Sequence, residues 1–254
     1  MKKIAFITGA SSGFGKACAL KFAENQFDLI LAARRIERLQ ALREKIEKDY
    51  GGRVLTLALD VQDKAAVFQA VASLAPQWQA IDVLVNNAGL ALGRDNFDEA
   101  SLSDWETMID TNVKGLLYVS RAVLPLMISR RKGHIINIGS TAGKQVYHKG
   151  NVYCATKHAV DAISQSMRID LLPHKIKVTA IHPGAAETEF SLIRLKQNKE
   201  EAKKVYEGYE PLHAVDIADI VFFTANLPEH VCINELEVTC LAQANAYYLF
   251  KETV

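Results

Sequence analysis

The feature of this sequence that most limits its fold is a regular alternation of short aliphatic runs with longer segments of helical period. Such an alternation is typical of strand–helix–strand units, in which helices cover both faces of a parallel sheet. We predict strands at residues 3–8, 28–33, 54–59, 81–85, 134–138, 177–181 and 231–239. We predict helices at residues 15–25, 36–50, 65–74, 104–130, 151–172 and 216–226. The pattern therefore indicates an α/β fold with a doubly wound parallel sheet of about seven strands.

The length and charge of the chain narrow its organisation and its partners. It has 254 residues, of which 49% are hydrophobic, so it can bury one large core, and we expect a single domain over 1–254. It carries 30 lysines and arginines against 29 aspartates and glutamates, and its formal net charge is +1. No overall field then draws it to nucleic acid or to an acidic membrane surface. We expect its partners to be small molecules or further copies of itself.

The apolar runs indicate neither export nor membrane insertion. The run Ile4–Ile7 near the start is too short for a signal peptide, and no run approaches the length of a bilayer span. The four cysteines form no CxxC pair and lie in apolar segments, as reduced thiols of a cytoplasmic protein do. The seven histidines stand at no metal-ligand spacing. We therefore expect a cytoplasmic protein that binds no metal.

The longest helical segment, 104–130, is predicted as one helix. Ser103 is the expected N-cap, with Glu106 as the matching acid three residues later, and Pro125 is expected to bend the helix. Asn112 lies inside this segment, where an asparagine is unfavourable unless its side chain has a specific partner. We therefore count Asn112 among the candidate functional residues.

Three glycines, Gly9, Gly13 and Gly15, occupy the connection between the first predicted strand and the first helix. In a doubly wound sheet of the Rossmann type, glycines at this place let the backbone approach a pyrophosphate, which meets the positive end of the helix. Their spacing differs from GxGxxG, and a tight turn without a ligand is the alternative. The position between a strand and a helix favours dinucleotide binding by Gly9, Ser11, Ser12, Gly13, Phe14 and Gly15.

Arg34 and Arg35 follow the second predicted strand, where a protein that prefers NAD usually has an acidic residue for the ribose hydroxyls. A guanidinium suits a phosphate and leaves no carboxylate to repel it. The alternative is two surface charges at the start of a helix that also contains Glu37. We predict NADP(H) as the cofactor, with its additional phosphate at Arg34 and Arg35.

Other strand ends add polar or small residues along the same edge of the sheet. Asp60 and Val61 end the third strand, and Asn86–Gly89 ends the fourth, which places them near the adenine and the ribose of a dinucleotide. Residues 183–188 follow the sixth strand and are expected to close over the nicotinamide, with Thr188 as the cap of the next helix. Each of these is also ordinary turn chemistry when taken alone. The predicted cofactor contacts here are Asp60, Val61, Asn87, Ala88, Gly89, Pro183, Gly184 and Thr188.

A tyrosine and a lysine four residues apart, Tyr153 and Lys157, follow Ser140, which ends the fifth strand. On a helix, this spacing puts both side chains on one face. An ammonium beside a phenol favours the phenolate, and it is expected to bring the pKa of Tyr153 from about 10 toward neutrality. Ser140 is expected to hydrogen-bond a substrate oxygen rather than attack it. Alone, such a pair is more often a half-buried ring beside a lysine stem, but the other motifs strengthen the catalytic interpretation.

Taken together and in this order, the motifs resemble the short-chain dehydrogenase/reductase family over nearly the whole chain. They are Thr8-Gly9-x3-Gly13-x-Gly15, Asn86-Asn87-Ala88-Gly89, Asn112, Ser140, Tyr153-x3-Lys157 and Pro183-Gly184-x3-Thr188. The resemblance implies that Tyr153 is the acid/base, and that Lys157 binds the ribose and lowers the tyrosine pKa. It implies that Ser140 binds the reacting oxygen, that Asn112 positions a water of the proton relay, and that hydride passes between nicotinamide and substrate. It also implies a homotetramer built by segment 104–130 and the helix that carries Tyr153.

Within that family the chain is similar to the bacterial NADP-dependent 3-hydroxy acid dehydrogenases, through residues 82–93, 104–112 and 133–143. The similarity implies oxidation of serine, allo-threonine or 3-hydroxyisobutyrate, or reduction of a semialdehyde in the reverse direction. Segment 144–149 is more basic than in that subgroup and the loop after Gly184 looks one residue shorter, and both are expected to border the substrate. The alternatives are a reductase of larger carbonyls, such as 3-oxoacyl thioesters, and a non-catalytic NADP-binding protein.

A small acid needs a positive charge in the substrate site. The segment 188–212 is charged and helical, and it is either a solvated surface or a lid over the cleft. Arg194 lies six residues after Thr188 and is expected to grip a carboxylate from this lid in a bidentate pair. The alternative for Arg194 is a side chain that faces solvent. We take Ser140 and Arg194 as the candidate substrate-binding residues.

Overall fold

The structure, a computed structural model, describes residues 2–252. Within those residues the main sheet has seven strands in the order β3-β2-β1-β4-β5-β6-β9, and every neighbouring pair is parallel. The strands are β1 (Ile4–Thr8), β2 (Asp28–Ala33), β3 (Val54–Ala58), β4 (Ile81–Asn86), β5 (Gly133–Ile138), β6 (Ile176–Pro183) and β9 (Glu235–Val238). The predicted doubly wound parallel sheet is thus confirmed.

The central strands are mostly apolar because a parallel sheet covered by helices is buried on both faces, and the few polar residues in them, such as Asn137, are buried as well. All residues of β1, β2 and β5 are buried. The edge strand β9 is different, since its residues alternate between exposed and half-buried positions. This weaker pattern explains why the predicted strand at 231–239 is longer than the strand that forms.

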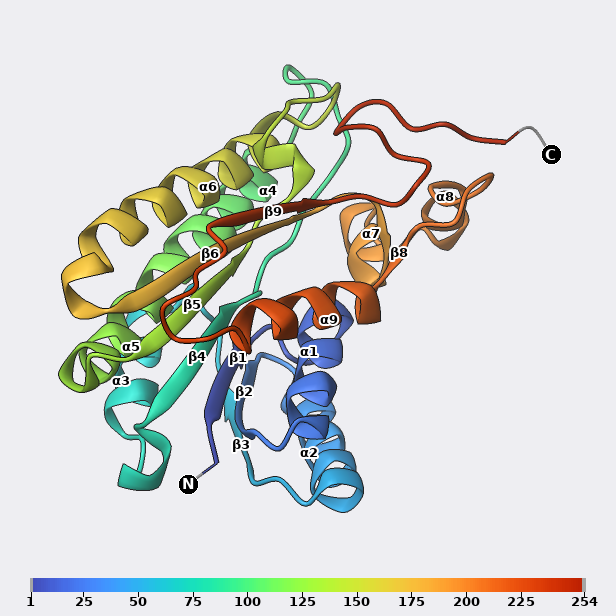
Figure 1. Ribbon diagram of the computed structural model, residues 1–254. Helices are drawn as coiled ribbons and strands as arrows, with labels where there is room; N and C mark the ends of the chain where they lie inside the picture. The colour runs from blue at the N-terminus through green and yellow to red at the C-terminus, as the bar shows by residue number, and fades with distance from the viewer. Residues whose placement is uncertain (1, 253–254) are drawn as a thin grey trace.

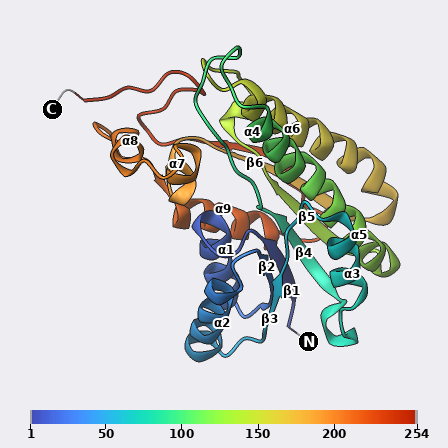
Figure 2. The ribbon, with the colours of Figure 1, turned by 180° about the vertical axis from the view of Figure 1, so that it is seen from behind.

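Helices cover both faces of the sheet (Figures 1 and 2). One apolar core lies under α1, α2 and α9, and the other lies under α3, α5 and α6. The helices are α1 (Gly13–Glu24), α2 (Ile36–Tyr50), α3 (Lys64–Ala72), α4 (Leu102–Ile109), α5 (Leu116–Arg130), α6 (Asn151–Leu171), α7 (Glu189–Arg194), α8 (Lys199–Lys204) and α9 (Ala214–Ala225). Short 3-10 turns lie at η1 (Pro76–Trp78), η3 (Thr141–Gly143) and η4 (Leu172–His174).

The order of the strands creates a crevice at one edge of the sheet. The chain runs from β1 outward to β2 and β3, and then returns to place β4 on the other side of β1. The loops after β1 and β4 therefore leave the sheet in opposite directions. In open α/β sheets, ligands bind at this switch point, outside the carboxyl ends of the strands.

The predicted single helix over 104–130 is wrong in two respects. It begins earlier, because Ser101 and not Ser103 is the N-cap of α4, with its hydroxyl accepting from the Asp104 N–H; Glu106 is therefore not a capping partner. It is also interrupted by a π-helical turn, η2 (Asp110–Gly115), that separates α4 from α5. Pro125 lies within α5. Gly115, the last residue of the turn, packs closely against Val61, because a Cβ at this position would lie 2.6 Å from a methyl of Val61.

The charged segment after β6 forms two short helices, α7 and α8, and a two-stranded sheet of β7 (Ala186–Glu187) and β8 (Leu212–His213). Thr188 caps α7, as predicted, with its hydroxyl accepting from the Phe190 N–H at 3.2 Å. In Figure 1 this segment, drawn in orange, lies beside the N-terminal end of α9 and apart from the layer of α3 and α5.

Candidate active site

A cavity of about 1130 Å³ opens at the carboxyl ends of the strands, between the body of the protein and α7. This volume exceeds the usual range of about 300–1,000 Å³ for a pocket that holds one small ligand, so it has room for a dinucleotide together with a small substrate. Nearly all of the predicted site residues line it. They are Gly9, Ser11, Ser12, Gly13, Phe14, Arg34, Arg35, Asp60, Val61, Asn87, Ala88, Gly89, Ser140, Tyr153, Lys157, Pro183, Gly184, Thr188 and Arg194.

Two predicted site residues, Gly15 and Asn112, are not part of the cavity lining. A Cβ at Gly15 would lie 2.5 Å from the Gly9 carbonyl oxygen and 2.5 Å from Asn87 Nδ2. Gly15 therefore serves close packing of α1 against the loop after β1, and its effect on a bound dinucleotide is indirect. Asn112 lies one layer behind the lining and is described below.

The glycine-rich turn holds a shape that most residues avoid. Gly9 and Gly13 have φ of 65° and 51°, in the left-handed region that favours glycine. Asn87 Nδ2 donates to the carbonyl oxygens of Thr8 and Gly9, at 2.9 and 3.2 Å, and ties the end of β4 to the turn. The N-cap of α1, Ser12, makes no side-chain cap hydrogen bond, and Ser12, Gly13 and Phe14 at the start of this twelve-residue helix line the cavity. The arrangement fits a pyrophosphate.

Arg35 and Arg38 form one cluster with a carboxylate from α7. Arg35 Nη2 donates to the hydroxyls of Ser11 and Ser12 at 3.0 and 2.8 Å, while Arg35 Nη1 donates to Glu189 at 3.1 Å. Arg38 Nη1 donates to the same carboxylate at 2.7 Å. Sequence reasoning missed Arg38 and Glu189, because Arg38 lies one helical turn beyond the strand end and Glu189 is distant in sequence.

Ser140, Tyr153 and Lys157 meet where β5 ends against α6. The η3 turn packs so closely on α6 that a Cβ at Gly143 would lie 2.5 Å from the Lys157 carbonyl oxygen. Ser140, just before the turn, lies near enough to Tyr153 to lower the tyrosine pKa, while its Oγ accepts from the Ala142 N–H at 3.1 Å. Lys157 Nζ donates to the Ile138 carbonyl oxygen at 2.9 Å and lies 6.0 Å from the centre of the Tyr153 ring.

The pKa values of this group follow from its burial. Burial raises the pKa of Tyr153 well above its ordinary value, and the Ser140 hydroxyl and the charge of Arg194 offset this only in part. Burial also lowers the pKa of Lys157 to about 8. The prediction that Lys157 brings the Tyr153 pKa toward neutrality is therefore wrong for the protein groups alone, because desolvation of the phenolate outweighs the nearby charges. At neutral pH, Tyr153 holds its proton.

Asn112 has the specific partners that its place in a helix required. Its Oδ1 accepts from the Leu90 N–H and its Nδ2 donates to the Leu90 carbonyl oxygen, both at 2.8 Å, while a third hydrogen bond reaches Thr156. The side chain thus pins the loop after β4 to α6. A Cβ at Gly89 would lie 3.2 Å from Asn112 Oδ1 and 3.7 Å from Lys157 Nζ, so this loop passes between the two.

Arg194 lies over the site instead of facing solvent. Its guanidinium carbon is 5.5 Å from the centre of the Tyr153 ring and 5.4 Å from that of Tyr147. Arg194 Nη1 donates to the Tyr147 hydroxyl at 2.8 Å, and Arg194 Nε donates to the Gly93 carbonyl oxygen at 3.3 Å. The end of α7 therefore places a cation beside the phenol. Tyr147 was missed as a site residue because nothing in its sequence neighbourhood marks it as the partner of a distant arginine.

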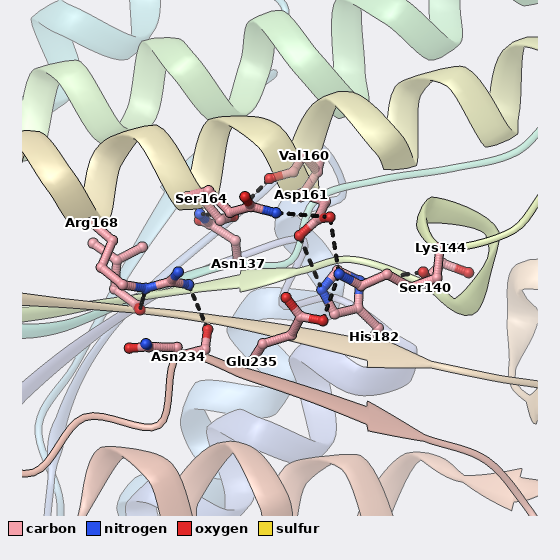
Figure 3. A network of polar contacts seen from close by, with 12 residues as sticks. Asn137, Ser140, Lys144, Val160, Asp161, Ser164, Arg168, His182, Asn234 and Glu235 are labelled. Carbon is pink, nitrogen blue, oxygen red and sulfur yellow. Dashed lines mark hydrogen bonds and ion pairs between the residues drawn. The ribbon is translucent and has the colours of Figure 1, made fainter.

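The basic segment 144–149 divides between two environments. Tyr147 and Lys149 line the cavity, but Lys144 points to the other side of the Ser140 loop, where it ion-pairs with Asp161 at 2.9 Å and with Glu235. The expectation that Lys144 borders the substrate is therefore wrong. Figure 3 shows Lys144, Asp161, Glu235 and His182 pointing toward one another behind Ser140.

This cluster behind Ser140 includes the carboxylates and the imidazole that would suit a metal ion. The ligand atoms of Asp161, His182 and Glu235 lie within 4.8 Å of one another. The Lys144 ammonium already contacts both carboxylates, so the cluster has its own cation. His182 Nδ1 lies 3.3 Å from the Ser140 carbonyl oxygen, which ties the cluster to the candidate catalytic loop. Burial lowers the pKa of His182.

Comparison with known proteins shows the family to which this chain belongs. Residues 3–199 match the family described as short chain dehydrogenase. The chain belongs to the short-chain dehydrogenase family. In this short-chain dehydrogenase, no helix within residues 2–252 combines the length and the apolar character that a bilayer crossing requires.

Relatives of this short-chain dehydrogenase match along nearly its whole length. The NADP-dependent 3-hydroxy acid dehydrogenase YdfG of Salmonella typhi is 50% identical over 244 residues, which are 96% of this chain and 97% of the relative. Sulfoacetaldehyde reductase 2 of Chromohalobacter salexigens is 44% identical over 245 residues, with 96% of each chain covered. The solved closed form of serine dehydrogenase complexed with NADP+ has a TM-score of 0.91 and 45% identity, and covers 96% of this chain and 97% of its own.

Proposed function

We propose that this protein is an NADP-dependent oxidoreductase that transfers a hydride between the nicotinamide and a small 3-hydroxy acid such as serine, allo-threonine or 3-hydroxyisobutyrate. The observation that carries the proposal is the position of Arg194, whose guanidinium lies 5.5 Å from the Tyr153 ring. An acid small enough to reach Tyr153 with its hydroxyl carbon meets this cation with its carboxylate. The relatives that act on serine and on 3-hydroxy acids support the same substrate class.

The residues present fit NADP(H). The left-handed glycines and the open N-terminus of α1 suit the pyrophosphate, and the Arg34–Arg35 pair suits the additional phosphate. Asp60, Val61, Pro183, Gly184 and Thr188 also line the cavity, and we assign the first two to the adenine and the others to the nicotinamide side of the cofactor. NADPH, when bound, supplies the hydride.

The side chains of the protein carry out the proton transfer of the reaction. In carbonyl reduction, the Tyr153 hydroxyl donates its proton to the substrate oxygen, and the Ser140 hydroxyl holds that oxygen by a hydrogen bond. The raised pKa of Tyr153 keeps it protonated and ready for this direction at neutral pH. Oxidation needs the phenolate, so its rate should rise with pH. The Lys157 ammonium and Arg194 are the charges that stabilise the phenolate.

An assay of NADPH formation tests the proposed function. We expect turnover with L-serine, 3-hydroxypropionate and 3-hydroxyisobutyrate, because each presents a hydroxyl and a carboxylate at a spacing that suits Tyr153 and Arg194. Reduction of 3-oxoacyl thioesters without oxidation of these acids would support the reductase of larger carbonyls instead. NADPH binding without turnover on the whole panel would support a binding protein.

A second candidate substrate, sulfoacetaldehyde, is favoured by the relative that reduces it. A sulfonate and a carboxylate are both small anions, and one arginine can hold either. We therefore include sulfoacetaldehyde reduction in the same panel. A kcat/KM for sulfoacetaldehyde that exceeds the values for all three 3-hydroxy acids and their semialdehydes would reassign the substrate without changing the site.

Replacing Arg194 with Met should raise the KM for 3-hydroxy acids about 30-fold, because a charge-assisted bidentate pair is lost. The Kd for NADPH should stay within about twofold, since that contact lies elsewhere. The measurement is steady-state kinetics beside a binding titration. Arg43→Met, which breaks only the surface pair of Arg43 with Glu47, is the matched control.

Loss of Arg194 also removes its contacts with Gly93 and Tyr147, so the lid itself is affected. A substrate analogue without a carboxylate separates the two effects. If Arg194 binds the carboxylate, Arg194→Met leaves kcat/KM for the neutral analogue near the wild-type value. An equal loss with acid and neutral analogue, or an unchanged KM for the acid, contradicts the proposed role.

We further propose a homotetramer assembled through α4, α5 and α6. Large apolar side chains on these helices are exposed, although such residues are costly to leave in water over a continuous face. They include Leu102, Ile109, Leu117 and Ile169. A solution mass equal to that of one chain, from light scattering, would contradict this proposal.

We place the protein in the cytoplasm. Cys18, Cys154 and Cys240 are buried, free thiols, as expected in a reducing compartment. NADP(H) is also a cofactor of intracellular metabolism. Recovery of the protein in a periplasmic or secreted fraction of its cells would contradict this placement.

A further inference from the structure

We propose that Glu189 competes with the 2′-phosphate of NADP(H) for Arg35 and Arg38, so that binding of the phosphorylated cofactor releases the start of α7 from α2. The inference rests on the proposed NADP(H) site and assigns a role to a residue of the lid. The ligand chemistry is a phosphomonoester on a ribose, which distinguishes NADPH from NADH.

The contacts place the Glu189 carboxylate where a phosphate would be held. Arg38 Nη1 donates to both carboxylate oxygens, at 2.7 and 3.0 Å, and Arg35 Nη1 donates to one of them at 3.1 Å. The other nitrogens of Arg35 hold the hydroxyls of Ser11 and Ser12 in the glycine-rich turn. The Arg35 guanidinium is thus held between the glycine-rich turn and Glu189. Both Arg35 and Glu189 line the cavity.

The local charges favour replacement of the Glu189 carboxylate by the phosphate over binding of both at Arg35 and Arg38. Two guanidiniums facing one carboxylate leave a local excess of one positive charge. A phosphomonoester brings a charge of about −1.5 to −2 at neutral pH, so the phosphate and the Glu189 carboxylate together would outweigh the charge of Arg35 and Arg38, the two guanidiniums that contact Glu189. Arg34, which also lines the cavity, adds one positive charge for the phosphate. Partial burial raises the pKa of Glu189, but the hydrogen bonds from Arg38 and Arg35 outweigh it and hold the pKa below its ordinary value. Glu189 is therefore ionised and repels the phosphate.

The exchange matters for the lid because Glu189 is the first residue of α7. Thr188, which caps α7, lies 3.6 Å from where a Cβ of Gly13 would be, so the start of the helix touches the glycine-rich turn. The other end of α7 carries Arg194, which lies over Tyr153. A single short helix thus connects the arginines of the phosphate site with the candidate substrate arginine. Release at Glu189 frees α7 to adjust when substrate binds.

The competition predicts a selective gain in NADPH affinity when the carboxylate is neutralised. In Glu189→Gln, we expect the Kd for NADPH to fall about fivefold, the scale of a partly exposed ion pair, and the Kd for NADH to stay within about twofold. Equilibrium titrations by cofactor fluorescence measure both, without any need for turnover. Glu47→Gln is the matched control. Glu47 pairs with Arg43 on α2, the helix that also carries Arg38, and it lies outside the cavity lining.

A second variant tests the arginine side of the competition. Arg38→Met should raise the Kd for NADPH and leave that for NADH unchanged, and its effect should be larger in the Glu189→Gln background, where Arg38 is free for the phosphate. Circular dichroism establishes that each variant is folded. An additive effect of the two substitutions would mean that Glu189 and the phosphate do not share Arg38.

The possible results separate this inference from the proposed function. An unchanged NADPH Kd in Glu189→Gln, with the wild-type preference for NADPH intact, overturns the competition and leaves the proposed function standing. Weaker binding of both cofactors would mean that the ion pairs clamp the cofactor, which also overturns the competition. Tighter NADPH binding in a protein that turns over no 3-hydroxy acid supports the competition and removes the proposed substrate.

Discussion

Replacing Tyr153 with Phe should lower kcat at least about 1,000-fold in both directions of the reaction, because the step loses its proton donor and acceptor. The side chain is 7% exposed and packs beside Phe190, so the phenylalanine ring fits the same space. Only the hydroxyl is removed. The Kd for NADPH should therefore stay within about threefold.

Steady-state kinetics with serine and its product, beside a cofactor titration, measures this effect. Tyr147→Phe is the matched control, since Tyr147 is also a cavity tyrosine whose pKa burial raises and whose hydroxyl meets Arg194. It should change KM more than kcat. The pH profile gives a second readout: wild-type oxidation should rise with pH as Tyr153 loses its proton, and the residual activity of Tyr153→Phe should lack that rise. A kcat within tenfold of the wild type would remove Tyr153 from the mechanism.

The fold was predictable because burial on both faces of the sheet leaves a plain trace in the sequence. The buried strands β1 and β2 consist mostly of apolar residues, and the helix after β2 shows apolar residues at helical spacing. The π-turn of η2 leaves no such trace. Residues of the turn contact distant parts of the chain, Gly115 at Val61 and Asn112 at Leu90, and these contacts are known only once the chain is folded.

The candidate site was predictable where its residues follow strands and less so where they come from the lid. The ends of parallel strands meet at one edge, so Gly9, Asn87 and Ser140 share a cavity once the sheet is known. The pairs Glu189–Arg38 and Arg194–Tyr147 join residues far apart in sequence, and no local pattern indicates them. The pKa of Tyr153 also depends on burial, which outweighs the neighbouring charges that the spacing reveals.

Replacing Lys157 with Met should abolish most activity and yet stabilise the protein at neutral pH. Activity should fall at least about 100-fold, because the cation that favours the Tyr153 phenolate is lost. Lys157 is 7% exposed, and burial lowers its pKa to about 8 from an ordinary value of about 10.4. At pH 7 the wild type therefore holds a buried charge that the unfolded chain carries at no cost. The difference between the Lys157 pKa in the folded chain and in the unfolded chain corresponds to a loss of roughly 3 kcal/mol in the free energy of unfolding.

The direction of the pH dependence follows from the number of protons that Lys157 binds in the folded and in the unfolded chain. Between about pH 8 and 10.4 the unfolded chain binds more protons at Lys157 than the folded chain, so the wild-type free energy of unfolding gains from this group as pH rises through that window. Methionine removes the penalty below pH 8 but also removes the donor to the Ile138 carbonyl oxygen, which costs about 1 kcal/mol. The net gain at pH 7 is then about 2 kcal/mol.

Urea unfolding at pH 7 and pH 9 measures the change, with Lys114→Met as the matched control. Lys114 is exposed and its pKa is raised by the hydrogen bond with Asp110, so its replacement should give no gain at either pH. The advantage of Lys157→Met over the wild type should shrink at pH 9, because the wild-type lysine is then largely neutral when folded. A variant less stable than the wild type at pH 7 would mean that favourable contacts of Lys157 outweigh its desolvation cost, and the predicted stabilisation would then be wrong.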